Sequence, residues 1–189
     1  MGNKYINIHQ DLLDRCQTGD KSAHFEIYRL YYKSMYNSSL RIVGVPEEAE
    51  DIMQDSFLTA FQKLKTYSGD VSFGAWLKKI VINRSLDALR KRKVVFEELH
   101  VELPFVSEPE SEVESITVEE VKSAIRSLSD GYRIILSLIL LEGYDHEEVS
   151  EILGIKNVTS RTQFSRARQR LREVLIENRN KQMKEVIYG

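Results

Sequence analysis

Residues 141–172 constrain the fold more than any other part of this chain, because their pattern predicts two helices joined by a glycine turn. In the first helix, Asp145 and Glu148 have the spacing of a capping box, and apolar residues follow at helical intervals. Gly154 then supplies the left-handed residue at which a helix commonly ends. The pattern therefore predicts a helix-turn-helix, whose second helix would lie in the major groove of DNA.

The second helix of this motif can be capped by Asn157 or Thr159 and carries five arginines. Its apolar residues recur at the spacing of one buried face. They are Phe164, Ala167, Leu171 and Leu175. The opposite face holds Arg, Gln, Ser and Thr, which contact base edges and phosphates in DNA complexes. Periodicity alone agrees equally well with an ordinary arginine-rich helix, which packs one face on the core and exposes its charged face to solvent.

Composition extends the helical prediction to the whole chain. Three prolines, nine glycines and few alternating Val/Thr-rich runs predict an all-α protein with short turns. Cys16 has no second cysteine to pair with, so nothing indicates an oxidising compartment. The N-terminus lacks the apolar core of a signal peptide, and the longest apolar run, residues 134–141, is too short to span a bilayer. We therefore expect a cytoplasmic protein without direct membrane insertion.

Charge divides the chain into three parts, although its net charge is only −2. Residues 1–93 carry 15 basic and 11 acidic side chains, residues 94–116 carry seven acidic and no basic ones, and residues 117–189 carry 12 and 11. The middle part also holds two of the three prolines. We therefore predict two small helical domains, residues 1–93 and 117–189, joined by a flexible acidic linker at 94–116.

A helix that begins at Pro46 is predicted to have a broad apolar face and an unusual second face. The second face consists of Asp51, Gln54, Asp55 and Leu58. A leucine among outward-facing acids indicates a docking surface. Single exposed leucines are common, however, so an ordinary solvated face is the simpler interpretation from the residues alone.

A turn and a basic helix follow at residues 65–93. Phe73 and Trp76 lie near the start of that helix, and lysines and arginines cluster toward its end. Aromatic and basic side chains beside a loop suit single-stranded DNA, since bases stack on rings while cations follow phosphates. The simpler interpretation is that the two rings anchor the helix in the core. The loop and the polar residues are then the better candidates for binding.

In this order, the segments resemble an extracytoplasmic-function sigma factor, a group of small proteins within the bacterial sigma-70 family. Residues 19–93 resemble region 2 of the family, and residues 128–155 and 159–171 resemble its region 4. The short acidic segment stands where larger sigma factors have a further module. The resemblance implies a protein that directs core RNA polymerase to promoters. An enzyme is the less favoured alternative, because the four histidines are scattered, Cys16 has no evident partner and no phosphate-binding glycine loop appears, so we expect no catalytic residues, cofactor or metal.

The resemblance also implies roles for individual positions. Those on the polymerase-docking face of region 2 are Asp51, Gln54, Asp55 and Leu58. Those expected to open the −10 element and capture a base of the non-template strand are Lys65, Thr66, Tyr67, Ser68, Lys79, Asn83 and Arg84. Those expected at the −35 element, with the first of them on a phosphate, are Arg133, Thr159, Arg161, Thr162, Ser165 and Arg166.

The implied partners are the β′ clamp helices and the β flap of core RNA polymerase, promoter DNA and an anti-sigma factor. Two residues of the recognition helix depart from the usual pattern, namely Ser160, whose helical angle points it toward the buried side, and Gln163. We expect the −35 specificity of this chain to lie at these departures. The residues alone leave open a stand-alone regulator that binds a palindrome as a dimer.

Overall fold

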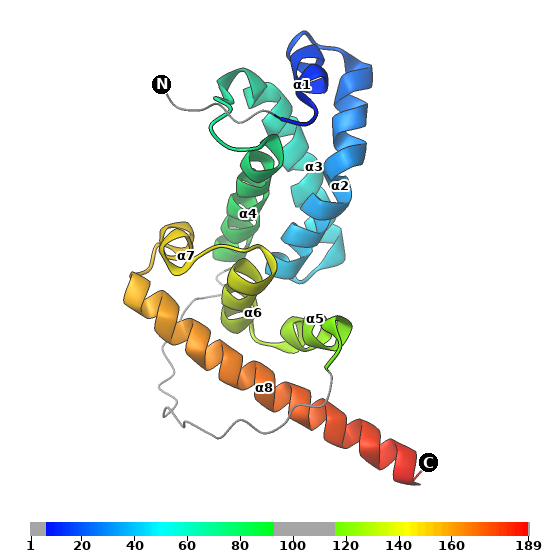
Figure 1. Ribbon diagram of the computed structural model, residues 1–189, viewed down its shortest axis with the longest axis vertical. Coiled ribbons are helices and arrows are strands. Elements are labelled where there is room, and N and C mark those ends of the chain that lie inside the picture. The colour runs from blue at the N-terminus through cyan, green and yellow to red at the C-terminus, as the bar shows by residue number, and fades with distance from the viewer. Residues whose placement is uncertain (1–6, 93–115, 189) are drawn as a thin grey trace. The chain divides into compact units, whose positions relative to one another are not determined.

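The computed structural model describes residues 7–92 and 116–188, with side chains as far as residue 181 (Figure 1). The chain divides into two compact units, Met1–Lys93 and Val94–Gly189. The described residues form helices and turns and contain no β-strand, which confirms the all-α prediction. The acidic linker predicted at residues 94–116 lies outside the described residues, apart from its last position.

The first unit is built on three long helices. Its elements in chain order are α1 (Gln10–Gln17), α2 (Lys21–Val43), α3 (Pro46–Lys63), the 3₁₀ turn η1 (Leu64–Thr66) and α4 (Phe73–Lys91). Helices α2, α3 and α4 pack against one another in pairs, and α1 packs against α2. The turn between α2 and α3 is tight because Gly44, with a φ of 75°, ends α2, and Pro46 occupies the first turn of α3.

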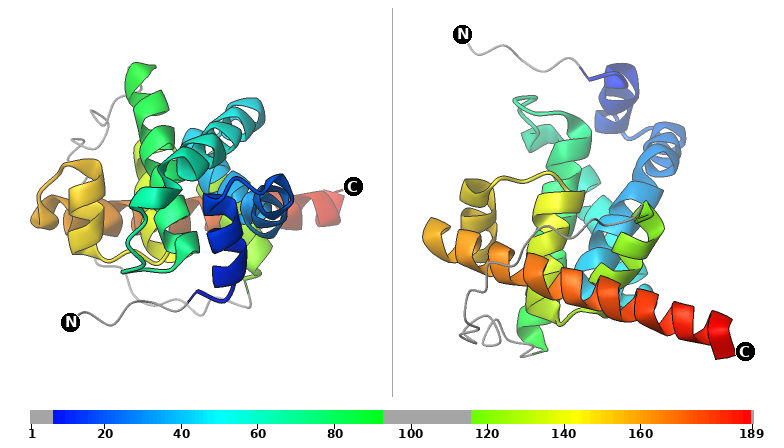
Figure 2. Two further views of the ribbon diagram at one scale, coloured as in Figure 1. Left: turned by 90° about the horizontal axis from the view of Figure 1, so that it is seen from above. Right: turned by 60° about the horizontal axis from the view of Figure 1, so that its bottom comes forward.

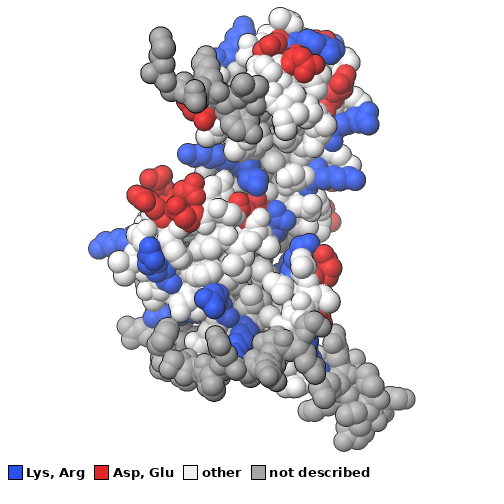
Figure 3. Space-filling view, viewed as in Figure 1, with Lys and Arg blue, Asp and Glu red and all other residues white. Residues whose placement is uncertain are grey.

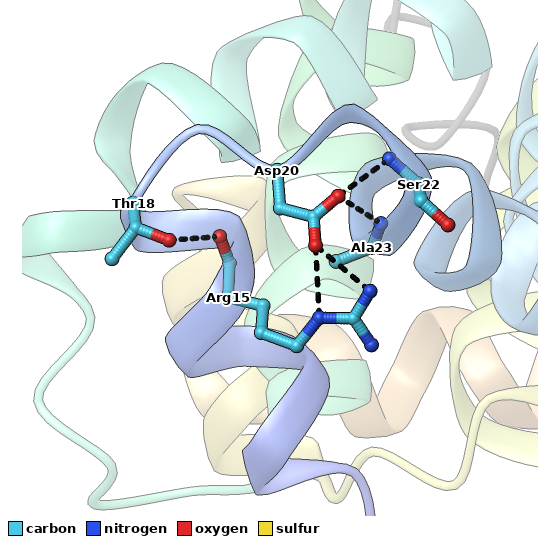
Figure 4. A network of polar contacts seen from close by, with 5 residues as sticks. All are labelled: Arg15, Thr18, Asp20, Ser22 and Ala23. Carbon is cyan, nitrogen blue, oxygen red and sulfur yellow. Dashed lines mark hydrogen bonds and ion pairs between the residues drawn. The ribbon is translucent and has the colours of Figure 1, made fainter.

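The turn between α1 and α2 is held by the carboxylate of Asp20 (Figure 4). Its Oδ1 accepts hydrogen bonds from the N–H groups of Ser22 at 2.8 Å and Ala23 at 3.3 Å, which caps α2. Its Oδ2 accepts a hydrogen bond from Nε of Arg15 at 2.9 Å. The bond from Arg15, together with these backbone donors, holds the pKa of Asp20 below its usual value. The ionised carboxylate thus joins the end of α1 to the start of α2.

Cys16 lies in the core of the first unit, where its side chain is 4% exposed, and burial raises the pKa of its thiol to about 11. Because the thiolate is the reactive form, we expect slow reaction with Ellman's reagent in mildly alkaline buffer while the protein is folded. Unfolding in urea should expose the thiol and make the reaction rapid. The rate of release of the coloured thiolate measures this, and equal rates with and without urea would contradict the prediction.

The second unit is organised around one long helix. Its elements are α5 (Val118–Ser127), α6 (Asp130–Leu136), η3 (Ser137–Leu141), α7 (His146–Leu153) and α8 (Asn157–Tyr188). Helix α8 packs against α5, α6 and α7, and Figure 2 shows it running across all three. Ala167 and Leu171 of α8 are buried, as its predicted apolar face requires, whereas Phe164 and Leu175 are half-buried.

The apolar run at residues 134–141 lies in a helical stretch that begins earlier, at Asp130, and changes from α-helix to π-helix toward its end. Its last five residues, η3, form a π-helical turn in which the N–H of Glu142 donates to the carbonyl of Ser137 at 2.9 Å. The buried part of this stretch packs inside the unit. Within residues 7–92 and 116–188, none of the helices combines the length and apolar content that crossing a bilayer requires.

Candidate nucleic-acid interface

Helix α7 and the start of α8 form the helix-turn-helix. The side chain of Asp145 accepts hydrogen bonds from the N–H groups of Glu147 and Glu148 at 2.8 and 2.9 Å. The carboxylate of Glu148 accepts one in return from the N–H of Asp145 at 2.9 Å. Gly154 ends α7 with a φ of 70°. The predicted capping box and glycine stop are both confirmed.

Helix α8 begins at Asn157, so the prediction that Asn157 or Thr159 caps it is wrong. The carbonyl of Lys156 accepts the hydrogen bond from the N–H of Ser160 at 3.0 Å, which places Lys156 in the cap position. The side-chain oxygen of Asn157 instead accepts a hydrogen bond from Nε of Arg161 at 2.9 Å. This contact orients the first arginine of the helix along its exposed side.

Ser160 and Gln163 belong to the interior of the second unit, since they are 0% and 3% exposed. Nδ1 of His146 lies 3.0 Å from Oγ of Ser160, and the His146 ring meets the edge of Phe164 at a centroid distance of 5.4 Å. The hydroxyl at position 160 therefore ties α7 to α8. Neither Ser160 nor Gln163 can contact DNA from a buried position, which corrects the expectation that they read the −35 element.

The predicted recognition face lies on the outer side of the first turns of α8. Arg161 and Thr162 are exposed, and Thr159, Ser165 and Arg166 are half-buried. At 100° per residue, these five positions share one side of the helix, whereas the buried residues share the other. The helix thus presents hydroxyl and guanidinium groups together, as direct reading of bases and phosphates requires.

Val158 lies near the middle of this face and was not predicted. It is 73% exposed. An apolar group at the start of a recognition helix suits contact with the methyl group of thymine. The sequence carries a signal for it, because the helical angle of Val158 opposes the buried residues of α8.

The distribution of charge within the second unit also favours α8 over α7 as the helix that lies against DNA. Figure 3 shows acidic side chains gathered near α7 and basic side chains spaced along the visible side of α8. The first turn of α7 carries Glu147 and Glu148, as suits the N-terminus of a helix. Attraction to phosphate is therefore strongest along α8.

Arg133 does not belong to the recognition face. Its side chain is 8% exposed, and its Nη2 lies 2.6 Å from Oδ1 of Asp130 in an ion pair on α6. Its low exposure leaves little of the guanidinium accessible to a phosphate. We therefore correct its expected phosphate contact and assign it to the internal structure of the unit.

The second face of α3 is exposed. Asp51, Gln54 and Asp55 are exposed, and Leu58 is 61% exposed. Nε2 of Gln54 donates a hydrogen bond to Oε1 of Glu50 at 3.2 Å. The face thus offers one exposed apolar side chain next to acidic and amide groups, an arrangement that suits a partner protein.

Arg84 of α4 reaches across to the same face of α3. Its Nη1 lies 3.3 Å from Oδ2 of Asp55, and its Nη2 donates a hydrogen bond to Oγ1 of Thr59 at 2.6 Å. Asp55 and Arg84, which were expected on separate surfaces, are in contact in the structure. Thr59 was missed, and its only signal is its place one turn beyond Asp55 on the same helix.

The other residues expected at the −10 element, in η1 and the loop that follows it, differ in exposure. Lys65 and Thr66 of η1 and Ser68 of the loop are exposed. Tyr67 instead turns inward, with its ring 5.9 Å from that of Phe73 and 5.3 Å from that of Trp76 between centroids. The inward position makes Tyr67 a support of the loop.

Helix α4 presents a polar surface beside this loop. Lys79 and Asn83 are exposed and one turn apart, whereas Arg84 is half-buried. Phe73 is 1% exposed, which confirms the simpler interpretation that its ring anchors the helix in the core, and Trp76 is half-buried.

The fold and these surfaces define a protein of two helical units in which a helix-turn-helix occupies the second. The family model for Sigma-70 region 2 matches residues 27–94, and the model for Sigma-70, region 4 matches residues 118–171. The chain belongs to the sigma-70 family, as an extracytoplasmic-function sigma factor. It therefore directs promoter recognition by RNA polymerase as a non-catalytic subunit, and the stand-alone regulator loses its support.

Sigma factors of other bacteria are similar to this chain over most of its length. The chain is 28% identical over 176 residues to the ECF RNA polymerase sigma factor SigW of Bacillus subtilis, covering 86% of this chain and 94% of the relative. It is 27% identical over 183 residues to the ECF RNA polymerase sigma-E factor of Haemophilus influenzae, covering 90% and 94%.

Similar proteins are also found among solved structures. The sigma factor RpoE of Bartonella quintana, crystallised with the anti-sigma factor NepR, matches with a TM-score of 0.55 and 26% identity over 79% of this chain and 94% of the other. CnrH, solved with the cytosolic domain of CnrY, matches with a TM-score of 0.52 and 22% identity over 89% and 97% of the two chains, which supports the fold alone.

Proposed function

We propose that the two units divide promoter recognition between them, as domains at residues 1–93 and 117–189 joined by a linker at 94–116. The second domain holds the −35 duplex through the outer face of α8. The first docks on the β′ clamp helices through the second face of α3 and opens the −10 element with the loop after η1 and the surface of α4. The exposed α8 face, with Val158 among hydroxyl and guanidinium groups, carries this proposal.

Two tethered weak binders make the spacing of the two promoter elements part of specificity, because both must be engaged at once. Core polymerase supplies the fixed separation. The protein alone should therefore bind promoter DNA weakly, and the complex with core polymerase should bind it tightly. Gel-shift titration with and without core polymerase measures this, and tight, sequence-specific binding by the isolated protein would contradict the proposal. Transcription in vitro from a genomic library would identify the promoters.

Further partners follow from the same assignment. The second domain contacts the β flap, and an anti-sigma factor holds the protein inactive in the cytoplasm. Support comes from the similar sigma factor RpoE of Bartonella quintana, which was crystallised with an anti-sigma factor. Purification of the tagged protein from uninduced cells, followed by mass spectrometry, would test for such a partner. Recovery of the protein only with core polymerase subunits would contradict the proposed anti-sigma factor.

Arg166→Ala should weaken promoter binding by about 1–3 kcal/mol if the guanidinium reads a base. The loss should depend on the −35 sequence, which competition between promoter variants for the assembled holoenzyme would measure. Arg126→Ala is the matched control, because Arg126 is an exposed arginine of α5, outside the helix-turn-helix. An equal loss at every −35 sequence would make Arg166 a phosphate contact, and a loss no larger than that of Arg126→Ala would remove it from the interface.

A further inference from the structure

Asn7, which precedes α1, lies at the base of the loop between η1 and α4. Its side chain is buried, with 8% of the residue exposed. Its Oδ1 accepts a hydrogen bond from the N–H of Phe73 at 2.8 Å, and its Nδ2 donates one to the hydroxyl of Tyr67 at 3.0 Å. These partners stand 66 and 60 residues away in the chain. One side-chain amide therefore holds both the residue that starts the loop and the residue that begins α4.

The orientation of this amide follows from its partners. The N–H of Phe73 can only donate, so the amide oxygen of Asn7 faces it. The NH₂ group then faces the hydroxyl of Tyr67 and also Oε1 of Gln10, at 3.2 Å. The Tyr67 hydroxyl accepts from Asn7 and donates to the carbonyl of Val71 within the loop. The chain of hydrogen bonds thus runs from α1 through Asn7 and Tyr67 into the loop itself.

The tip of the loop has few contacts of its own. Gly69 has a φ of 79°, Ser68 donates a hydrogen bond to the carboxylate of Asp70, and Val71 is 48% exposed. Such a segment has little buried surface to restrict it, so its conformation depends on the contacts at its base. Asn7 and the inward ring of Tyr67 supply those contacts.

We propose that Asn7 is a positioning residue for −10 recognition. It holds the loop in the conformation that captures the promoter strand, although its own buried side chain does not contact DNA. A loop that is already ordered binds with a smaller loss of conformational entropy than one that must be ordered on binding. The inference rests on the proposed role of the loop at the −10 element.

The test compares Asn7→Ala with Ile8→Ala in holoenzyme assembled from the full chain and core polymerase. Ile8 is the matched control because it is adjacent and 88% exposed. Loss of the buried hydrogen bond to Phe73 and the partly buried one to Tyr67 should reduce −10 opening about tenfold in Asn7→Ala, measured by permanganate reactivity of −10 thymines. Opening by Ile8→Ala should equal wild type. Both variants should assemble with core polymerase as wild type does. The assay temperature is one at which Cys16 of each free variant still reacts slowly with Ellman's reagent, which shows that the first unit is folded.

Hydrogen exchange and a double-mutant cycle separate positioning from general destabilisation. Amides of residues 68–73 should exchange faster in free Asn7→Ala, while those of α2 should not change. Because Asn7 acts partly through Tyr67, combining Asn7→Ala with Tyr67→Phe should cost less than the product of the two single effects. Multiplicative effects, or −10 opening within twofold of wild type, would overturn the inference. Failure of wild-type holoenzyme to open the −10 element would instead refute the proposed function.

Discussion

Leu58→Arg is expected to weaken binding to core RNA polymerase about thirtyfold or more, because loss of a hot-spot residue of an interface costs about 2 kcal/mol or more. Leu58 is 61% exposed among the acids of α3, so free solvent accommodates an arginine there without disturbing the core. The substitution removes the apolar contact and places a charge in the interface. Fluorescence anisotropy of labelled protein titrated with core polymerase would measure the change.

Leu30→Arg provides the control, since Leu30 is an equally large residue of α2 with 50% exposure and lies outside the proposed docking face. Protection of the Cys16 thiol shows whether the first unit of each variant is folded. Equal affinities of Leu58→Arg and wild type for core polymerase would show that this face of α3 is an ordinary solvated surface and not a docking face.

Phe73→Ala should destabilise the first unit by about 3–5 kcal/mol, the usual cost of removing a fully buried ring. The Phe73 ring is 1% exposed and lies 5.5 Å from that of Tyr31 and 5.7 Å from that of Trp76 between centroids. A small domain has a total stability of about 5–15 kcal/mol, so the loss is a large fraction of that stability and should lower the urea midpoint of this unit. Trp76 is the only tryptophan, and its fluorescence during urea unfolding reports this unit specifically.

Phe25→Ala is the matched control for the loss of a ring. Phe25 is 61% exposed on α2, so its removal should change stability by about 0.5 kcal/mol or less. Similar urea midpoints for Phe73→Ala and Phe25→Ala would contradict the assignment of Phe73 to the core.

The helices were predictable because local chemistry sets where they begin and end. Asp145 caps the start of α7, and the left-handed Gly154 ends it. Pro46 likewise marks the start of α3 by its own local conformation. Helical periodicity likewise separated the apolar face of α3 from the exposed face that holds Leu58. Such signals depend on residues within one or two turns of each other.

The contacts between distant residues were not predictable from one sequence. Asn7 meets Tyr67 across 60 residues, and Arg84 meets Asp55 across 29, and neither pair shares a local pattern. The burial of Arg133 was missed for the same reason, because resemblance suggested a surface role while its packing in α6 decided otherwise. Which polar side chains face inward depends on tertiary packing that periodicity does not specify.

The contact between His146 and Ser160 limits how the DNA specificity of this protein can be redesigned. Positions 158, 161 and 162 face outward and can be exchanged for those of another recognition helix without entering the core. Ser160 cannot be exchanged alone, because an apolar replacement would leave the His146 ring without its hydroxyl partner. A graft from a relative with an apolar residue at 160 should therefore carry the residue at 146 with it, so the smallest transferable recognition unit spans both helices.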